Sequence, residues 1–196
     1  MPTLNERGEP KANGVDDWRD SAVLNGLLVC FDIPGAVPIE NYINQHGRLI
    51  RCYGDDPCDT SRDNFTPTVA AAHKLDKIHL VRFAVERVLE TNFFPNGDIL
   101  SPGLKSYFEF VLGIGKLNWW FTLELWFNAK VTPMAESNQL LCILGSLKDD
   151  WYLKKYCQWN PEWALGIKNY WSEWRNDPDV TFKLLLRISE RRIDAT

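Results

Sequence analysis

Apolar residues recur three or four positions apart along most of this chain, which is the spacing of a helix with one buried face. A polar residue that can act as an N-cap, such as Asp16 or Asp17, precedes the first of these segments. No pair of alternating segments flanks a tight-turn signal of the kind that joins two strands. Helices are expected over 16–31, over 38–45, after Asp76, over 104–112 and over 119–127.

Proline positions sharpen the helix boundaries. Thr66 followed by Pro67 is typical of an N-cap and the first helical residue, so a helix is expected to begin there. If this helix began at Ser61 instead, Pro67 would clash with the carbonyl group of Asp63 and kink it.

The C-terminal half continues the helical pattern. Ser137 is expected to cap one long helix that runs to about Tyr156. The chain closes on a pair of arginines, Arg191 and Arg192, which are expected to be solvated. Two further helices are expected to begin at the similar polar–proline pairs Asn160-Pro161 and Asp177-Pro178.

The length of 196 residues is typical of a single domain. Residues 1–15 are polar and predict a loose or draped arm, and 16–196 form the expected helical domain. We expect an all-α fold of antiparallel helical hairpins, with a short extended segment near 48–53. A partial α/α toroid is one arrangement that such hairpins can take.

Composition excludes several classes of function. The net charge of −4 gives no basic surface for nucleic acid. The first residues lack the apolar stretch of a signal peptide, and five cysteines, an odd number, favour reduced thiols in a cytoplasm. The histidine and cysteine spacings fit no usual metal site, and no nucleotide-binding or hydrolase motif is present, so neither a metal nor a cofactor is expected.

The apolar stretch over 104–131 is interrupted by charges and glycines, which favours two buried helices over a membrane span. Contact with a membrane surface is a weaker hypothesis, because tryptophans in helices usually belong to the core. It would use Trp119, Trp120 and Trp126, and burial of these rings would exclude it.

Two polar clusters are candidates for chemistry. Asp20 and Ser21 lie at the head of the first helix, where acidic residues also favour the helix dipole without any further function. The second cluster combines Arg51 with Ser61-Arg62-Asp63 and has an equally plain structural interpretation, a loop held by arginine–aspartate pairs.

The functional interpretation joins these clusters in one polar cleft. Asp63 and a second acid, Asp20, would be the general acid and base, as in glycan hydrolysis. Arg51 and Arg62 would orient the substrate, and Ser61 and Ser21 would donate hydrogen bonds. If Asp63 were buried in a closed pair with Arg51, this hypothesis would fail.

Three short motifs carry a resemblance. Asp20-Ser21-Ala22, Arg51-Cys52 and Ser61-Arg62-Asp63-Asn64 occur in an order that resembles a group of bacteriophage and prophage helical proteins. That group is itself similar in pattern to the helical-hairpin toroids of glycan-active enzymes. The resemblance implies a phage-type protein in the host cytoplasm or the virion, with a glycan-directed hydrolase or lyase activity on a polysaccharide.

A non-catalytic protein that binds a host or virion protein is the alternative. Such a host-directed inhibitor or assembly factor would expose aromatic side chains in the tryptophan-rich half. The best candidates for this interaction surface lie among polar residues and are Trp159, Trp163 and Trp174.

Overall fold

The computed structural model describes residues 21–51, 60–130, 137–160 and 178–193; the predicted arm over 1–15 lies outside these ranges. Within them the chain is mostly helical and contains no β-strand, which confirms the predicted all-α class. The elements are α1 (Ser21–Cys30), the 3-10 helix η1 (Ile39–Tyr42), α2 (Arg62–Lys74), α3 (Ile78–Thr91), α4 (Pro102–Val111), α5 (Trp119–Lys130), α6 (Ser137–Ser146), α7 (Trp151–Trp159) and α9 (Pro178–Ile193).

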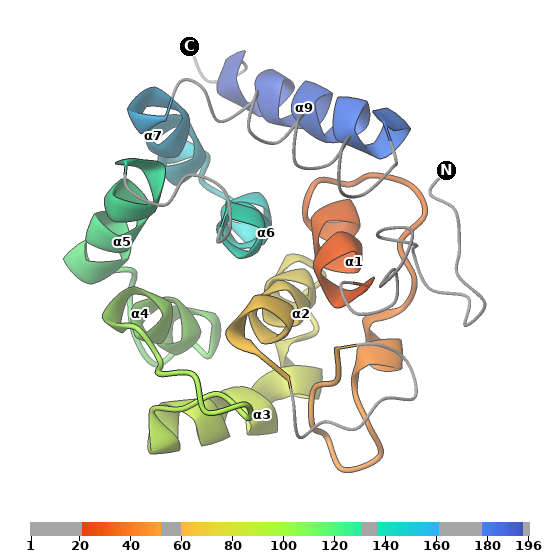
Figure 1. Ribbon diagram of the computed structural model, residues 1–196, viewed down its shortest axis with the longest axis vertical. Helices are drawn as coiled ribbons and strands as arrows, with labels where there is room; N and C mark the ends of the chain where they lie inside the picture. The colour runs from red at the N-terminus through yellow and green to blue at the C-terminus, as the bar shows by residue number, and fades with distance from the viewer. Residues whose placement is uncertain (1–20, 52–59, 131–136, 161–177, 194–196) are drawn as a thin grey trace.

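Helices α1, α2 and α6 pack against one another at the centre of the molecule, while α3, α4, α5, α7 and α9 surround them (Figure 1). Five helices form a continuous series of contacts: α2 packs on α3, α3 on α4, α4 on α5, and α5 on α7. Closure of the helices into a toroid stays a prediction.

Of the central helices, α1 and α6 are parallel. A Cβ atom on Gly26 of α1 would lie 2.7 Å from Cβ of Pro67 in α2 and 3.2 Å from Sγ of Cys142 in α6. Further along, a Cβ atom on Gly145 of α6 would lie 2.9 Å from Cβ of Cys30 in α1. Gly26 and Cys30 of α1 therefore lie beside Cys142 and Gly145 of α6 in the same order, so α1 and α6 run in the same direction. Glycine is needed at both positions because the backbones approach so closely.

The start of α2 differs from the prediction. The helix begins at Arg62, with Ser61 in extended conformation as its N-cap, so Pro67 lies inside it and the expected start at Pro67 is wrong. Proline has no N–H to donate to the carbonyl of Asp63 one turn earlier. The ring of Pro67 instead fills the space that Gly26 leaves on α1, and this tertiary packing outweighs the lost hydrogen bond.

A break divides the long helix that the sequence predicted over 137–156. Helix α6 ends at Ser146 and α7 begins at Trp151. The guanidinium group of Arg191 donates hydrogen bonds to the carbonyl oxygens of Gly145 (3.0 Å) and Leu147 (3.1 Å), and its Nε donates to Oδ1 of Asp150 at 2.8 Å. Arg191 thus satisfies carbonyl groups that the end of α6 leaves open, and the expectation that it is solvated is also wrong.

The extended segment is short but present. Leu49 forms an isolated antiparallel bridge with Ile43, and the hydroxyl group of Thr60 donates to the carbonyl oxygen of Leu49 at 2.8 Å. The carbonyl oxygen of Arg51 then accepts from the backbone N–H of Ala22 at 3.4 Å. These contacts bring Arg51 to the N-terminal end of α1.

Candidate functional site

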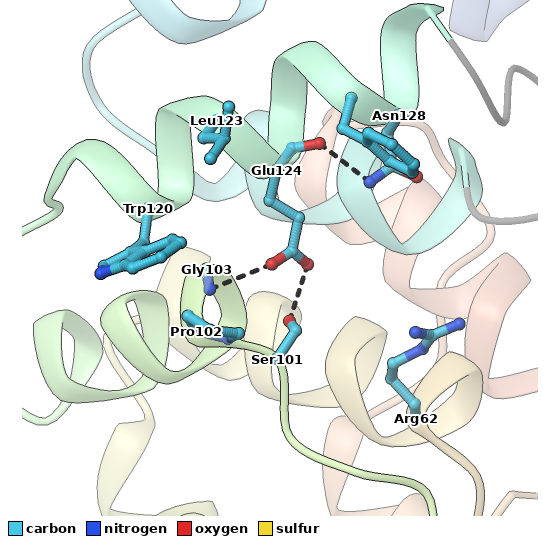
Figure 2. Close-up of a pocket in the computed structure, with 9 residues that line it drawn as sticks. Arg62, Ser101, Pro102, Gly103, Trp120, Leu123, Glu124 and Asn128 are labelled. Carbon is cyan, nitrogen blue, oxygen red and sulfur yellow. Dashed lines mark hydrogen bonds between the residues drawn. The ribbon is translucent and has the colours of Figure 1, made fainter.

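A cleft of about 360 Å³ opens between the first turn of α2, the first turn of α4 and one side of α5. Figure 2 shows the Glu124 side chain extending from α5 towards α4, with Arg62 of α2 on one side of it and Trp120 on the other. The residues that line the cleft are Arg62, Ser101, Pro102, Gly103, Trp120, Leu123, Glu124, Phe127 and Asn128.

Glu124 is fixed by the beginning of α4. Its carboxylate oxygens accept a hydrogen bond from the hydroxyl group of Ser101 at 2.8 Å and from the backbone N–H of Gly103 at 3.0 Å (Figure 2). A negative group is stabilised there by the positive end of the helix dipole. Gly103 has no side chain in the way, whereas a Cβ atom at that position would lie 2.8 Å from Cβ of Glu124.

The polar side of the cleft also includes an amide and a guanidinium group. Nδ2 of Asn128 donates to the backbone carbonyl of Glu124, one turn earlier in α5, at 2.9 Å. Arg62 is partly buried, and its Nε lies 3.5 Å from Oδ1 of the exposed Asp63. The cleft therefore combines a carboxylate, an amide and a guanidinium group within reach of one ligand.

The other side of the cleft is aromatic. Trp120 and Phe127 lie two turns apart on α5 and remain substantially exposed. The ring of Trp120 stacks on that of Trp119, with 3.8 Å between the ring centroids. Binding sites for small molecules are typically concave and apolar with a few converging polar groups, which describes this cleft.

The structure distributes the predicted site residues differently from the sequence interpretation. Arg62 lines the cleft, and Asp63 lies beside it in the first turn of α2. Ser61 caps α2. The Asp63 carboxyl group is exposed and is not buried in a pair with Arg51, so the condition that would have ended the enzyme hypothesis is not met.

Three predicted residues lie away from this cleft or outside the described ranges. Ser21 is fully buried, and its hydroxyl group is 2.6 Å from that of Tyr42, which places it in the interior. Arg51 is half-buried, and its Nε has no hydrogen-bond partner within the described residues. Asp20 immediately precedes the residues that the structure describes.

A second polar cluster joins α2, α4 and α6 but is not arranged for nucleophilic catalysis. The hydroxyl group of Ser146 donates to the carbonyl oxygen of Ile143 at 2.7 Å and lies 2.9 Å from the Tyr107 hydroxyl and 3.3 Å from Nδ1 of His73. Because its proton points to a carbonyl, Ser146 has none to give to the imidazole. Burial lowers the pKa of His73 and raises that of Tyr107, so both are neutral at pH 7.

The tryptophans also differ from expectation. Trp159 is half-buried against the core, while Trp163 and Trp174 lie outside the described residues. Trp119, Trp120 and Trp126 are 61%, 43% and 43% exposed, so the expectation that α5 is a buried helix is wrong. We call its outward side the aromatic face, formed by Trp119, Trp120, Leu123, Trp126 and Phe127.

The sequence contained one signal for the cleft that the sequence interpretation missed. Glu124 is the single acid in the largely apolar segment 119–130, and such a residue needs a polar partner. The partner, the Ser101-Pro102-Gly103 segment, is distant in sequence. No family model, curated protein or solved structure matches this chain, so its functional interpretation comes from these residues.

Proposed function

We propose that this protein is a phage-type glycan-directed protein that binds a saccharide unit in the cleft between α2, α4 and α5. The observation that carries the proposal is the meeting of an aromatic wall, Trp120 and Phe127, with the polar groups of Arg62, Glu124 and Asn128. Aromatic rings can pack on the apolar C–H face of a sugar ring, while hydroxyl groups need donors and acceptors at their edges.

The polar groups of the cleft would bind the sugar hydroxyl groups in different ways. The carboxylate oxygens of Glu124 are acceptors that suit sugar hydroxyl groups. The guanidinium group of Arg62 and the amide of Asn128 would accompany it as orienting groups. Since Glu124 is held by the first turn of α4, its role is to bind and orient rather than to move during a reaction.

The candidate acid for hydrolysis or elimination is Asp63. Its carboxyl group is exposed and lies beside Arg62, a residue of the cleft. In this proposal Asp63 transfers a proton at the bond to be cleaved. Asp20, which the sequence interpretation pairs with it, lies outside the described residues.

Binding and turnover are tested separately. Wild type, Trp120→Ala and Arg62→Ala are titrated with oligosaccharides from bacterial envelope and capsular polysaccharides, and heat is measured by calorimetry. We expect a loss of about tenfold or more in affinity for each variant, because a stacking or charged contact in a cleft contributes on the order of 1–3 kcal/mol. Phe83→Ala is the control, since Phe83 is an exposed aromatic residue on α3 that does not line the cleft.

Turnover is measured as new reducing ends for wild type and Asp63→Asn. Cleavage by wild type that disappears in Asp63→Asn, with unchanged binding, is the expected result. Binding without cleavage would restrict the proposal to a glycan-binding protein. Absence of binding to every saccharide would contradict it and favour the alternative of a protein that binds a host or virion partner.

A further inference from the structure

The aromatic face of α5 is unusual because it is the outward side of a helix on the rim of the molecule (Figure 1). The inward side consists of Phe121, Leu125, Asn128 and Ala129, which are buried. A helix at a protein surface normally presents polar residues on the opposite side, whereas α5 presents five apolar ones. A contiguous exposed apolar surface of this kind marks a place of contact with another apolar phase or molecule.

A lysine lies at each end of this face. Lys116 precedes α5 and Lys130 ends it, and both are exposed. Glu124, the acid of the helix, lies at the edge of the face, where its carboxylate is bonded to Ser101 and Gly103 at the beginning of α4. The aromatic face is therefore bounded at its two ends by cations, while the carboxylate at its edge is held by α4.

This distribution of charge disfavours a second copy of the chain as the occupant. A symmetric dimer through α5 would place the same face on both sides of the interface. In an antiparallel arrangement Lys116 of one copy would meet Lys130 of the other, and in a parallel one each lysine would meet its own counterpart. Either arrangement brings cations together.

An anionic lipid surface complements both properties. Tryptophan suits the boundary between acyl chains and headgroups, since its ring is apolar and its N–H is polar. Leucine and phenylalanine can enter the acyl region, while long lysine side chains reach back to anionic headgroups. We propose that the aromatic face of α5 binds the surface of an anionic membrane, with Lys116 and Lys130 on the headgroups. No helix in the described part of the chain is long and apolar enough to span a bilayer, so this contact is peripheral.

The exposure of three tryptophans changes the weight of the membrane hypothesis. Membrane contact is the weaker hypothesis from the sequence, because tryptophans in helices usually belong to the core. The structure instead exposes Trp119, Trp120 and Trp126. The aromatic face overlaps the proposed glycan site, because Trp120, Leu123 and Phe127 also line the cleft. Trp119 and Trp126 belong to the aromatic face and do not line the cleft, so they test the membrane contact alone.

The test is sedimentation of the full chain with vesicles of equal parts phosphatidylglycerol and phosphatidylcholine, compared with vesicles of phosphatidylcholine alone. Wild type is expected to bind the anionic vesicles, and its tryptophan emission is expected to shift to shorter wavelength. The double variant Trp119→Ser/Trp126→Ser should lose about tenfold or more in vesicle affinity. Lys116→Glu and Lys130→Glu should each lose about fivefold, and only on the anionic vesicles.

The matched control is Phe83→Ser/Phe182→Ser, which removes two aromatic side chains that are 62% and 65% exposed on α3 and α9. It should bind vesicles as wild type does, and all variants should keep the wild-type helical circular dichroism. Absence of binding to anionic vesicles, or equal binding by Trp119→Ser/Trp126→Ser, would overturn the proposal. So would a dimer, seen by light scattering, that this variant converts to monomer, because the face would then belong to a second copy.

Discussion

Helices α2 and α5 are of similar length, 13 and 12 residues, but relate composition to burial in opposite ways. Half of α2 is polar or charged, yet its residues from Asn64 to Ala72 are all buried. Most of α5 is aromatic or aliphatic, yet one entire side faces outwards. The neighbours explain the difference, since α2 lies between α1, α3 and α6, whereas α5 packs mainly on α4 and α7.

Two hydrogen bonds of the buried polar side chains of α2 are local, whereas Oδ1 of Asn64 and Oγ1 of Thr66 have no hydrogen-bond partner within the described residues. The hydroxyl group of Thr68 donates to the carbonyl of Asn64 at 3.2 Å, and Nδ2 of Asn64 donates to the hydroxyl oxygen of Ser61 at 3.1 Å. Such local bonds allow short polar side chains to enter the interior. The three alanines, Ala70 to Ala72, keep the helix thin enough for close neighbours on several sides. Composition alone therefore gives the wrong order of burial for these two helices.

The largest expected effect compares the stability cost of removing one phenylalanine side chain from each helix. Phe65 of α2 is buried, with its ring centroid 5.4 Å from that of Phe94 and 5.8 Å from that of Phe108. We expect Phe65→Ala to lower the free energy of unfolding by about 3–5 kcal/mol. Phe127→Ala on α5 removes an equal side chain from a half-exposed position and should cost less than about 1 kcal/mol.

Urea denaturation followed by circular dichroism measures both variants. Equal losses would mean that the aromatic face is covered in solution, and the contrast between the two helices would disappear. A dependence of the Phe127→Ala loss on protein concentration would identify the cover as another copy of the chain.

The second prediction concerns the Glu124 carboxylate, a polar group that ties α5 to α4. Gly103→Ala should push the Glu124 carboxylate off the first turn of α4, because the new methyl group would lie 2.8 Å from Glu124 Cβ. The expected cost is about 1–3 kcal/mol, from overpacking and from the lost hydrogen bonds.

A double-mutant cycle isolates this contact. In a Glu124→Gly background, which removes Cβ of residue 124 as well as the carboxylate, Gly103→Ala should be nearly neutral, because no side chain then lies opposite the new methyl group and alanine favours a helix over glycine. An unchanged cost in that background would show that Gly103 is required for another reason. The same variants titrated with saccharide would show whether the position of Glu124 matters for binding.

The sequence predicted the helical class because apolar spacing is a local property, and it placed α4, α5 and the start of α9 at Pro178 closely. The errors arose where distant residues decide the outcome. Pro67 fits inside α2 because Gly26 leaves space for it on α1, and Arg191 ends α6 from a helix that comes much later in the chain. Of the candidate site, Arg62 was predicted, whereas Glu124 depends on a contact with Ser101 that no local pattern reveals.

The smallest expected effect is a pH dependence of the free energy of unfolding. It arises from His73, in the last turn of α2. His73 packs edge-on against the rings of Tyr107 and Phe110, and burial lowers its pKa below the ordinary value of 6.5. The folded protein therefore resists protonation of this ring, while the unfolded chain accepts a proton as the pH falls through that value. Stability contributed by neutral His73 is present at pH 7 and is lost as the pH falls below it.

We accordingly expect the free energy of unfolding to fall between pH 7 and pH 5.5, and to fall less in His73→Gln. His79→Gln is the matched control, because His79 lies on α3 and is exposed. A pH dependence unchanged in His73→Gln, or removed by His79→Gln, would contradict the assignment. The expected sign distinguishes α2 from α5: a helix buried in spite of polar side chains becomes less stable when one of them takes up charge, whereas the aromatic face of α5 has no group that titrates in this range.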